Sequence, residues 1–391
     1  MPVDGRTSEP SIANHQPGQR QPMSLRLLAD DLTGALDTAA ELVGLTGPVR
    51  TYWHGALPQT PPPNAALDSG TRELTPAPAA AIVTELTAHL TDAAIAYKKI
   101  DSLLRGSTLA ELAACMRAGG WQRCVLAPAF PHQGRLTRNG RQYVRNPHGS
   151  LAEVGGDIIA ALRAHGAVAQ AGRPGADLPP GISVFDAETD EDLSDIAALG
   201  RRSPGPILWS GTGGLARALV SHPPMGSPLA LPRPILGLFG SDQSVTAAQL
   251  AACGTHWTTL RDGGSESASL LTRTLRGAGV VLASVDLPPG LTRSDAALRI
   301  RAAMDGLAGL LEPPGTLVVA GGETLRGLCV ALGAQCLEVQ GSIQPGLPWS
   351  ILRGGRWDGV TVVSKSGAFG SPGLLRDLLL TNSDLFIERT L

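Results

Sequence analysis

The segment Leu27–Asp37, LLADDLTGALD, decides the class of fold that we expect for this chain of 391 residues. A short apolar run is typical of a buried strand, and the Thr-Gly turn after the two aspartates opens an amphipathic stretch. In an α/β sheet, ligands bind at the carboxyl ends of the strands. Helix capping by Asp31 or Thr33 accounts for one polar residue here, but not for two adjacent aspartates. We therefore interpret Asp30 and Asp31 as candidate site residues.

From residue 23 onward, short apolar runs alternate with amphipathic stretches. This alternation predicts two α/β domains with largely parallel sheets, and an active site in the cleft between the domains. Strands are expected at 25–29, 93–97, 124–127, 182–186, 207–210, 235–239, 280–285, 316–320 and 360–364. Helices are expected at 35–45, 108–117, 151–164, 190–199, 245–252, 296–307, 324–332 and 374–380.

Proline content suggests where the domains divide. Segment 221–234 holds five prolines in fourteen residues, which is too many for a continuing helix or a central strand. We interpret it as a linker between an N-terminal domain over 23–220 and a C-terminal domain over 235–391. Residues 1–22 are polar, rich in Pro, Gly and Gln, and without periodicity, which predicts a disordered tail and makes Met23 an alternative start.

The composition argues against several classes of partner. A net charge of -2 and only 4% aromatic residues do not favour a nucleic-acid-binding face. No apolar run reaches the roughly 18 residues that a membrane-spanning helix needs, and we find no secretory signal. The five cysteines include no Cys-x-x-Cys pair, and the eight histidines are scattered. These features predict a cytoplasmic protein with reduced thiols and no structural zinc.

The lysines are concentrated in a second segment, Tyr97–Glu111, YKKIDSLLRGSTLAE. The chain has only three lysines, and two of them, Lys98 and Lys99, are adjacent in this strand-to-helix junction. Lysine and arginine at a fixed spacing can hold a carboxylate or a phosphate. A solvated charged loop is the alternative, but it does not explain why lysine is kept only here and at Lys365.

A third segment, Ala127–Tyr143, follows an expected strand with proline, glycine and three arginines, Arg135, Arg138 and Arg141. A long loop of this composition is typical of a binding site for an anionic small molecule, although an ordinary exposed loop is an equally good interpretation. His132 is expected to be a loop residue rather than a catalyst.

Three glycine-bearing turns follow strands in the second half of the chain: Gly240-Ser241, Gly321–Thr324 and Ser364–Gly370. Glycine lets backbone N–H groups approach phosphate oxygens, and a helix N-terminus adds a favourable partial charge. Three such turns at successive strand ends predict a nucleotide phosphate site. Lys365 lies inside the last turn and is a candidate phosphate ligand.

Several familiar motifs are missing. The chain contains no Gly-Lys dipeptide, which excludes a Walker A loop, and no Gly-x-Gly-x-x-Gly follows a strand. The second absence disfavours an NAD-dependent dehydrogenase. The glycine-rich segment Ser210–Gly214 is expected to form a turn that lines the cleft between the domains.

Five segments taken together, LLADDLTGALDTA, KKIDSLLRG, APAFPHQGRLTRNGRQYV, GGETL and VVSKSGAFGSP, resemble the four-carbon acid sugar kinase family. The resemblance covers roughly residues 24–385. It implies an N-terminal sugar-acid-binding domain and a C-terminal nucleotide-binding domain. It also implies ATP-dependent phosphorylation of D-threonate, D-erythronate or 3-oxo-tetronate at the 4-hydroxyl.

The resemblance also implies roles for individual residues. Substrate binding is implied for Asp31, Arg72, Asp101, Ser102 and Arg105, and ATP binding is implied for Ser241, Gly321, Gly322, Glu323, Thr324 and Gly367. The chain departs from the family pattern at Leu103, where threonine is usual, at Glu323, where aspartate is frequent, and at Asp242-Gln243, where small residues are common.

These residues suggest a mechanism. Arg72, Arg105 and one of Lys98 and Lys99 would hold the substrate carboxylate, with Asp30 part of the same substrate site. Asp31 or Asp101 would orient or deprotonate the attacking hydroxyl. Mg²⁺ would bridge the ATP phosphates with few protein ligands.

Other interpretations of the same residues remain open. They are a kinase of a different small hydroxy acid and a sensor that binds an acid sugar and a nucleotide without catalysis. A homodimer is the assembly we would test.

Overall fold

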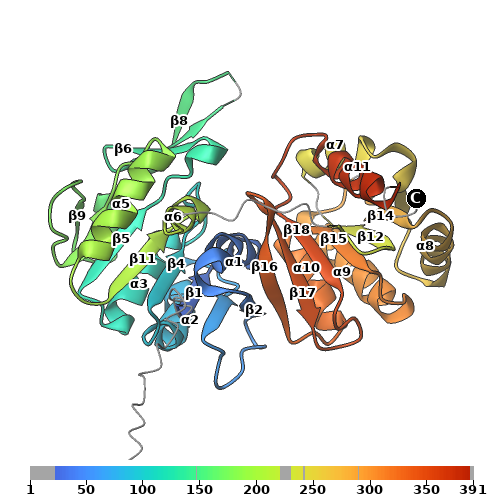
Figure 1. Cartoon of the computed structure of the whole chain (residues 1–391), viewed down its shortest axis with the longest axis horizontal. Helices are drawn as coiled ribbons and strands as arrows, with labels where there is room; N and C mark the ends of the chain where they lie inside the picture. The colour runs from blue at the N-terminus through green and yellow to red at the C-terminus, as the bar shows by residue number, and fades with distance from the viewer. Residues whose placement is uncertain (1–22, 147, 221–229, 241–242, 289, 388–391) are drawn as a thin grey trace, which may run out of the picture.

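The computed structural model describes residues 23–146, 148–220, 230–240, 243–288 and 290–387, and Figure 1 shows them as two lobes joined side by side. The expected disordered tail 1–22 and most of the expected linker 221–234 lie outside the described residues. The N-terminal lobe contains β1 (Leu25–Ala29), α1 (Leu32–Thr46), β2 (Val49–Trp53), β3 (Asn64–Asp68), α2 (Pro76–Thr87), η1 (Ala88–Leu90), β4 (Ile95–Lys99), α3 (Thr108–Gly119), β5 (Arg123–Ala127), η2 (Pro131–Gln133), β6 (Arg135–Arg138), β7 (Arg141–Arg145), β8 (Leu151–Asp157), α4 (Ile158–Ala164), β9 (Ala169–Ala171), β10 (Gly181–Val184), α5 (Asp190–Arg202), β11 (Ile207–Gly211) and α6 (Gly213–Ala218).

The C-terminal lobe repeats the alternation of strands and helices. It contains β12 (Ile235–Phe239), α7 (Ser244–Ala251), η3 (Gly254–His256), β13 (Trp257–Leu260), α8 (Ser265–Ala278), β14 (Val280–Val285), α9 (Arg293–Leu310), β15 (Thr316–Ala320), α10 (Gly322–Ala331), β16 (Cys336–Gln344), β17 (Leu347–Arg353), β18 (Thr361–Lys365) and α11 (Leu374–Ile387). Among the described residues, none of these helices is both long and apolar enough to cross a bilayer.

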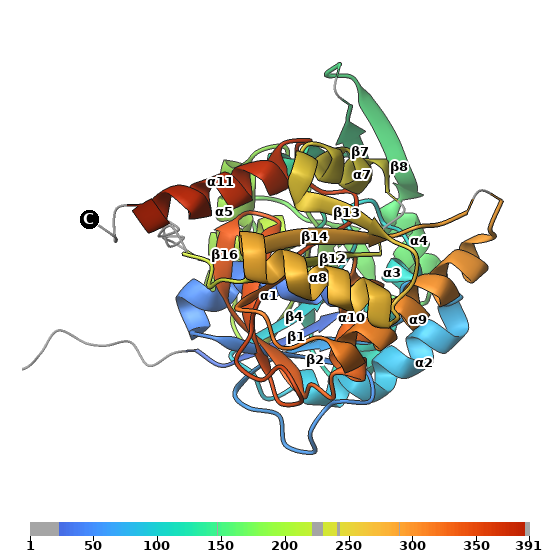
Figure 2. The same ribbon diagram turned by 90° about the vertical axis from the view of Figure 1, so that its right-hand side faces the viewer.

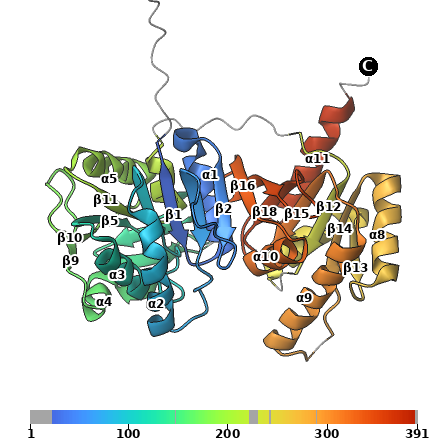
Figure 3. The ribbon, with the colours of Figure 1, turned by 90° about the horizontal axis from the view of Figure 1, so that it is seen from below.

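Most strands of both lobes, among the described residues, form one sheet. It has 15 strands in the order β13-β14-β12-β15-β18-β17-β16-β2-β3-β1-β4-β11-β5-β10-β9, and Figure 3 shows it running from one lobe into the other. In this sheet the strands are parallel except for the β16–β17 hairpin, which pairs antiparallel with β18 on one side and with β2 on the other. The α/β prediction with largely parallel sheets is confirmed, and the hairpin adds a connection between the sheets.

The hydrophobic core also extends across both lobes. One cluster of buried side chains extends from α1, α5 and α6 of the first lobe to α8, α9 and α10 of the second. The other face is covered separately, by α2, α3 and α4 in the first lobe and by α7 and α11 in the second. Because burial of apolar surface is the dominant favourable term in folding, the shared cluster couples the two lobes energetically.

Two local predictions are wrong. The helix expected at 151–164 begins only at Ile158, because its first half is strand β8, which pairs with β7. Gly155 and Gly156 have positive φ, which disrupts a helix, and Asp157 caps the shorter helix through Ala160 N–H. The segment expected to be one long loop contains the β6–β7 hairpin, and the small sheet β6-β7-β8 projects from the lobe in Figure 2.

Candidate active site

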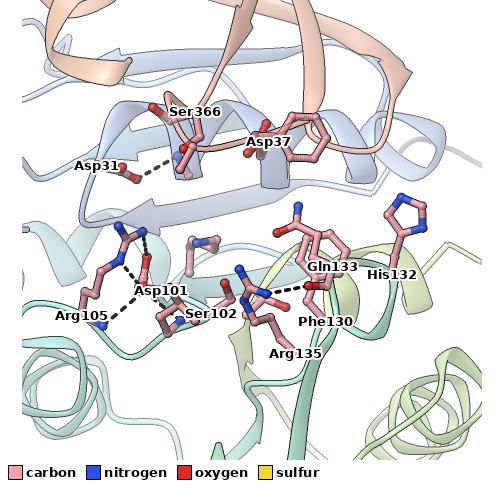
Figure 4. Close-up of a pocket in the computed structure, with 18 of the residues that line it drawn as sticks. Asp31, Asp37, Asp101, Ser102, Arg105, Phe130, His132, Gln133, Arg135 and Ser366 are labelled. Carbon is pink, nitrogen blue, oxygen red and sulfur yellow. Dashed lines mark hydrogen bonds and ion pairs between the residues drawn. The ribbon is translucent and has the colours of Figure 1, made fainter. Parts of the chain in front are cut away.

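A cavity of about 360 Å³ lies where the two lobes meet, a size that suits a small ligand. Figure 4 shows Asp31, Asp37 and Ser366 on one side of it, and Asp101, Ser102 and Arg105 on the other. The lining residues come from α1, the ends of β3, β4, β5, β11 and β18, and the loops that follow: Asp31, Thr33, Gly34, Asp37, Arg72, Lys99, Asp101, Ser102, Leu103, Arg105, Phe130, His132, Gln133, Arg135, Thr212, Gly213, Ser366, Ala368, Phe369 and Gly370.

Asp31 has both a structural role and a place in the cavity. It is the N-cap of α1, and its Oδ1 accepts the Gly34 N–H at 2.8 Å. The same oxygen lies 3.2 Å from Nη2 of Arg72. A side chain at position 34 would collide with this carboxylate, since an added Cβ would lie 2.6 Å from Asp31 Oδ1. The sequence Asp-x-x-Gly therefore keeps the carboxylate open to the cavity.

Arg72 connects three carboxylates. Its guanidinium forms a bidentate pair with Asp30, and it also contacts Asp31 and, at 3.2 Å, Oδ2 of Asp101. Burial alone would raise the pKa of Asp30, but the hydrogen bonds and charge of Arg72 outweigh it and lower that pKa. Asp30 itself is buried and lies outside the set of cavity-lining residues. It holds the Arg72 guanidinium in place from the side away from the cavity.

The loop after β4 is organised around Asp101. Its Oδ1 accepts the backbone N–H groups of Leu103 at 2.9 Å and of Arg105 at 3.2 Å, and the Arg105 guanidinium binds both carboxylate oxygens. Leu104 has a left-handed φ of 54°, which is strained for a residue with a side chain. Burial opposes ionisation of Asp101, but Arg105 and Arg72 hold its pKa well below the ordinary value. Asp101 is therefore a weak base.

The two adjacent lysines have different environments. Lys98 points away from the cavity into the interior, where its Nζ lies 2.8 Å from Oε2 of the buried Glu111. Lys99 lines the cavity, and its Nζ donates to the Ile100 carbonyl at 2.7 Å. Because successive strand residues face opposite sides of a sheet, only one of the two lysines can reach the site. Of the two lysines that we expected could hold the substrate carboxylate, only Lys99 lines the cavity.

Asp37 and Arg135 are among the cavity residues that the sequence analysis does not propose as site residues. Asp37, two turns into α1, has a buried Oδ1 without a hydrogen-bond partner among the described residues, and burial raises its pKa to about 7. Arg135, in the β6 hairpin, donates from Nη1 to the Gln133 carbonyl at 2.7 Å, while its buried Nε has no partner within the same part of the chain. Spacing alone could not separate Arg135 from its neighbours Arg138 and Arg141, which form ion pairs with Glu188 and Glu153 at the surface.

Gly240 and the glycine turns after β15 and β18 lie at one edge of the sheet, because β12, β15 and β18 are parallel neighbours. Gly321 has φ +98°, a conformation that favours glycine, and its N–H donates to the Lys365 carbonyl at 2.9 Å. Gly322 approaches the first lobe so closely that an added Cβ would lie 2.7 Å from Oγ1 of Thr33. Glu323 is exposed and pairs with Arg326.

The segment Gly321–Thr324 is adjacent to the cavity but outside its lining, and the same is true of Gly367. Ser241, the remaining residue that we expected to bind ATP, lies outside the described residues.

Lys365 is buried at the end of β18. Its Nζ lies 3.2 Å from Oγ1 of Thr246 and 3.4 Å from the Gly367 carbonyl. Among the described residues no carboxylate pairs with it, and burial lowers its pKa to about 8. Lys365 thus supports the loop whose residues Ser366 and Ala368–Gly370 reach the cavity.

The described ranges contain no group of three or more His, Cys, Asp or Glu side chains suited to hold a metal ion.

Comparison with known proteins agrees with this arrangement. Residues 25–157 match a family model described as a sugar-binding N-terminal domain, and residues 258–375 match a nucleotide-binding C-terminal domain. The chain is 32% identical to a D-threonate kinase of Cupriavidus necator, over 90% of this chain and 96% of that protein. It is 26% identical to a D-erythronate kinase of Heliobacterium modesticaldum, over 88% and 94% of the two chains.

A solved structure described as a putative tRNA synthase from Salmonella typhimurium has the same fold. It superposes with a TM-score of 0.69 at 20% identity, covering 90% of this chain and 97% of that one. The sequence motifs, the two-lobed cavity and the full-length relatives lead to one conclusion: the chain belongs to the four-carbon acid sugar kinase family and is a carbohydrate kinase.

Proposed function

We propose that this kinase transfers the γ-phosphoryl group of ATP to the 4-hydroxyl of a four-carbon sugar acid, with D-threonate as the first candidate and D-erythronate and 3-oxo-tetronate as the others. The cavity carries the proposal: it joins the acid- and cation-rich strand ends of the first lobe to the glycine-rich turn of the second. Phosphoryl transfer needs mainly positioning and charge neutralisation, which such an arrangement can supply.

The acceptor would lie against the first lobe, among Asp31, Arg72, Lys99, Asp101, Ser102 and Arg105, with Asp30 behind Arg72. Arg72 and Arg105 are already paired with carboxylates, so their charges are largely balanced within the protein. Lys99 and Arg135 line the cavity and have no carboxylate ion pair among the described residues. We therefore assign the substrate carboxylate mainly to Arg135 and Lys99, with Arg72 and Arg105 shaping the site around the hydroxyl groups.

ATP would lie against the second lobe, along Ser241, Gly321, Gly322, Glu323, Thr324, Lys365 and Gly367. The parallel pairing of β12, β15 and β18 supports this placement, because it brings the ends of the three strands to one edge of the sheet. Glycine turns and helix N-termini at such an edge commonly bind phosphate. Mg²⁺ bound with ATP would neutralise phosphate charge, and we expect it to have few protein ligands. Closure of the two lobes would exclude water as a competing acceptor.

We also propose the division of labour expected from the sequence, with residues 23–220 binding the acid and 235–391 binding the nucleotide. A cytoplasmic location is supported by the five cysteines, all of which are buried free thiols. A homodimer stays a prediction, which is tested by measuring the molar mass of the purified chain in solution by light scattering.

An assay of ADP release against a panel of four-carbon sugar acids tests the proposed function. We expect turnover with at least one of D-threonate, D-erythronate and 3-oxo-tetronate, and phosphate at the terminal hydroxyl by NMR of the product. Turnover only with a hydroxy acid of another length would favour the alternative kinase. Binding of both ligands without ADP release would favour the sensor.

A further inference from the structure

We propose that Asp37, rather than Asp31 or Asp101, accepts the proton of the hydroxyl that attacks ATP. This assignment rests on the proposed function and adds to it the residue that performs the proton transfer. Asp37 lines the cavity from α1, and Figure 4 shows it on the same wall as Ser366, the side from which the second lobe enters. A proton acceptor for phosphoryl transfer belongs at this boundary, where the acceptor hydroxyl meets the nucleotide.

The hydrogen bonding of Asp37 leaves it free for this task. Its Oδ1 is buried and has no partner among the described residues. A buried polar atom without a partner is costly, and such atoms are rare in folded proteins. Because the Asp37 side chain lines the cavity, the hydroxyl of a bound sugar acid can donate a hydrogen bond to its carboxylate.

The competing carboxylates are already engaged. Asp31 accepts the Gly34 N–H and contacts Arg72, and Asp101 is held by Arg72, by Arg105 and by two backbone N–H groups. Burial opposes ionisation of Asp101, but Arg105 and Arg72 lower its pKa and make it a poor base. Burial raises the pKa of Asp31, but its Oδ1 is already occupied by the Gly34 N–H and by Arg72. Asp31 and Asp101 are suited to fixing positions, whereas Asp37 has a free oxygen to receive a proton.

The charges facing Asp37 suit a base that works near neutral pH. Burial raises its pKa to about 7, with the Lys99 ammonium from β4 opposing this rise and the Asp31 and Glu41 carboxylates of α1 adding to it. A general base is most effective when its pKa lies near the working pH, because it is then both deprotonated and basic. Entry of a substrate anion would raise this pKa further.

The proposed step balances as follows. The hydroxyl oxygen forms a bond to the γ-phosphorus while the bond from that phosphorus to the β,γ-bridging oxygen breaks, and ADP leaves with the electron pair. The hydroxyl proton passes to the Asp37 carboxylate and is later released to water. The net products are the phosphorylated acid, ADP and one proton, and ATP is the only co-reactant.

The test uses the full chain and the sugar acid that the ADP-release panel identifies. Asp37→Asn keeps the volume and can still donate or accept a hydrogen bond, but it cannot take up a proton. We expect its kcat to fall at least 100-fold, with KM for both substrates within about threefold of the wild type. The acid limb of the wild-type kcat–pH profile, near pH 7, should disappear from the residual activity.

Glu41→Gln is the matched control, because Glu41 is the next acid along α1, also has a pKa raised by burial to about 7, and lies outside the cavity lining. We expect it to keep the wild-type kcat. A wild-type protein that turns over no acid would refute the proposed function. The assignment of Asp37 is judged separately, by the ratio of kcat in the variant to kcat in the wild type.

Three results would overturn the assignment. Asp37→Asn with kcat near the wild-type value would show that proton uptake there is not needed. Recovery of kcat at raised Mg²⁺ concentration would make Asp37 a metal ligand instead of a base. An equal loss of kcat in Asp37→Asn and in Glu41→Gln, with lowered thermal unfolding midpoints in both, would mean that the helix rather than the carboxylate was affected.

Discussion

At the level of single residues, pairing decides which charges of the cavity are left for a ligand. Arg72 and Arg105 hold Asp30, Asp31 and Asp101 in place, and these five side chains form a rigid polar frame. A fully paired network fixes geometry, but it offers little net charge to an incoming anion. Substrate affinity should therefore depend most on cations outside the frame.

Arg135→Ala should raise KM for the sugar acid at least tenfold, because it removes a guanidinium whose buried Nε has no partner among the described residues. Loss of a charge-assisted hydrogen bond, worth about 1.5–3 kcal/mol, would raise KM by this tenfold or larger factor. We expect kcat and KM for ATP to change much less. Arg138→Ala, three residues on in the same hairpin and paired with the exposed Glu188, is the control and should behave as the wild type. Equal KM values in the two variants would refute the role of Arg135.

Lys365→Met should separate stability from nucleotide binding. The variant removes a buried ammonium that no carboxylate neutralises within the described residues, so the unfolding midpoint without ligand should stay the same or rise. The KM for ATP should rise, or kcat should fall, while KM for the sugar acid stays unchanged. Steady-state kinetics measures kcat and the two KM values, and thermal unfolding measures the midpoint. A change confined to the sugar acid would contradict the division of roles between the lobes.

At the level of elements, helix α1 contains two acids that burial makes hard to ionise. The pKa of Asp37 and of Glu41 is raised to about 7, above the ordinary values of 3.8 and 4.5. Between these limits the folded state binds more protons than the unfolded state, so the free energy of unfolding falls as pH rises. The carboxylates with lowered pKa, Asp30 and Asp101, affect stability only at more acidic pH.

Thermal unfolding without ligand should therefore give a higher midpoint at pH 5.5 than at pH 8. The corresponding difference in the free energy of unfolding should shrink by about 2 kcal/mol in Asp37→Asn and in Glu41→Gln, since roughly 1.5 pH units separate pH 5.5 from a pKa of about 7 and one unit is about 1.4 kcal/mol. Wild type and variants measured side by side at both pH values provide the comparison. Midpoints that rise with pH in the wild type would contradict the buried, neutral state of these acids.

The elements also show where the sequence was informative. The β-α alternation predicts the parallel strands well, because a strand buried on both faces is an unbroken apolar run, as in Leu236–Phe239. The β16–β17 hairpin was missed because its sequence mixes glycine and polar residues, and its pairing with β2 is a long-range contact that no local pattern encodes. The 151–164 error arose because residues 151–157 pair with another strand, and that pairing overrides local propensity.

For the site, the sequence located the chemical groups but not their partners. Adjacent aspartates and lysines were recognised, yet only the fold shows that Asp30 and Lys98 are buried behind the cavity and that Lys99 faces it. Asp37 was inside the segment that decided the fold, but its free oxygen depends on what the remaining elements leave unfilled. Whether a buried oxygen has a hydrogen-bond partner depends on how distant elements pack around it, and the spacing of residues in the sequence does not show this.

At the level of the whole molecule, the two lobes share one sheet and one core cluster. Leu337 on β16 is fully buried, belongs to that cluster and pairs with Thr51 of β2. Leu337→Ala should cost about 2–5 kcal/mol and lower the stability of both lobes in a single transition. Val330→Ala, at an exposed position of α10, should change stability by less than about 0.5 kcal/mol. Calorimetry that resolves two separate transitions in the wild type would contradict the coupling.

The central claim is that one cavity, built by both lobes, transfers phosphate from ATP to a four-carbon sugar acid. The measurement that tests it most directly is ADP release by the purified chain with ATP, Mg²⁺ and each of D-threonate, D-erythronate and 3-oxo-tetronate, followed by NMR of the product. We predict turnover with at least one of them, strictly dependent on the acid, and a phosphate on the 4-hydroxyl. Absence of acid-dependent ADP release from folded protein with all three acids would contradict the claim.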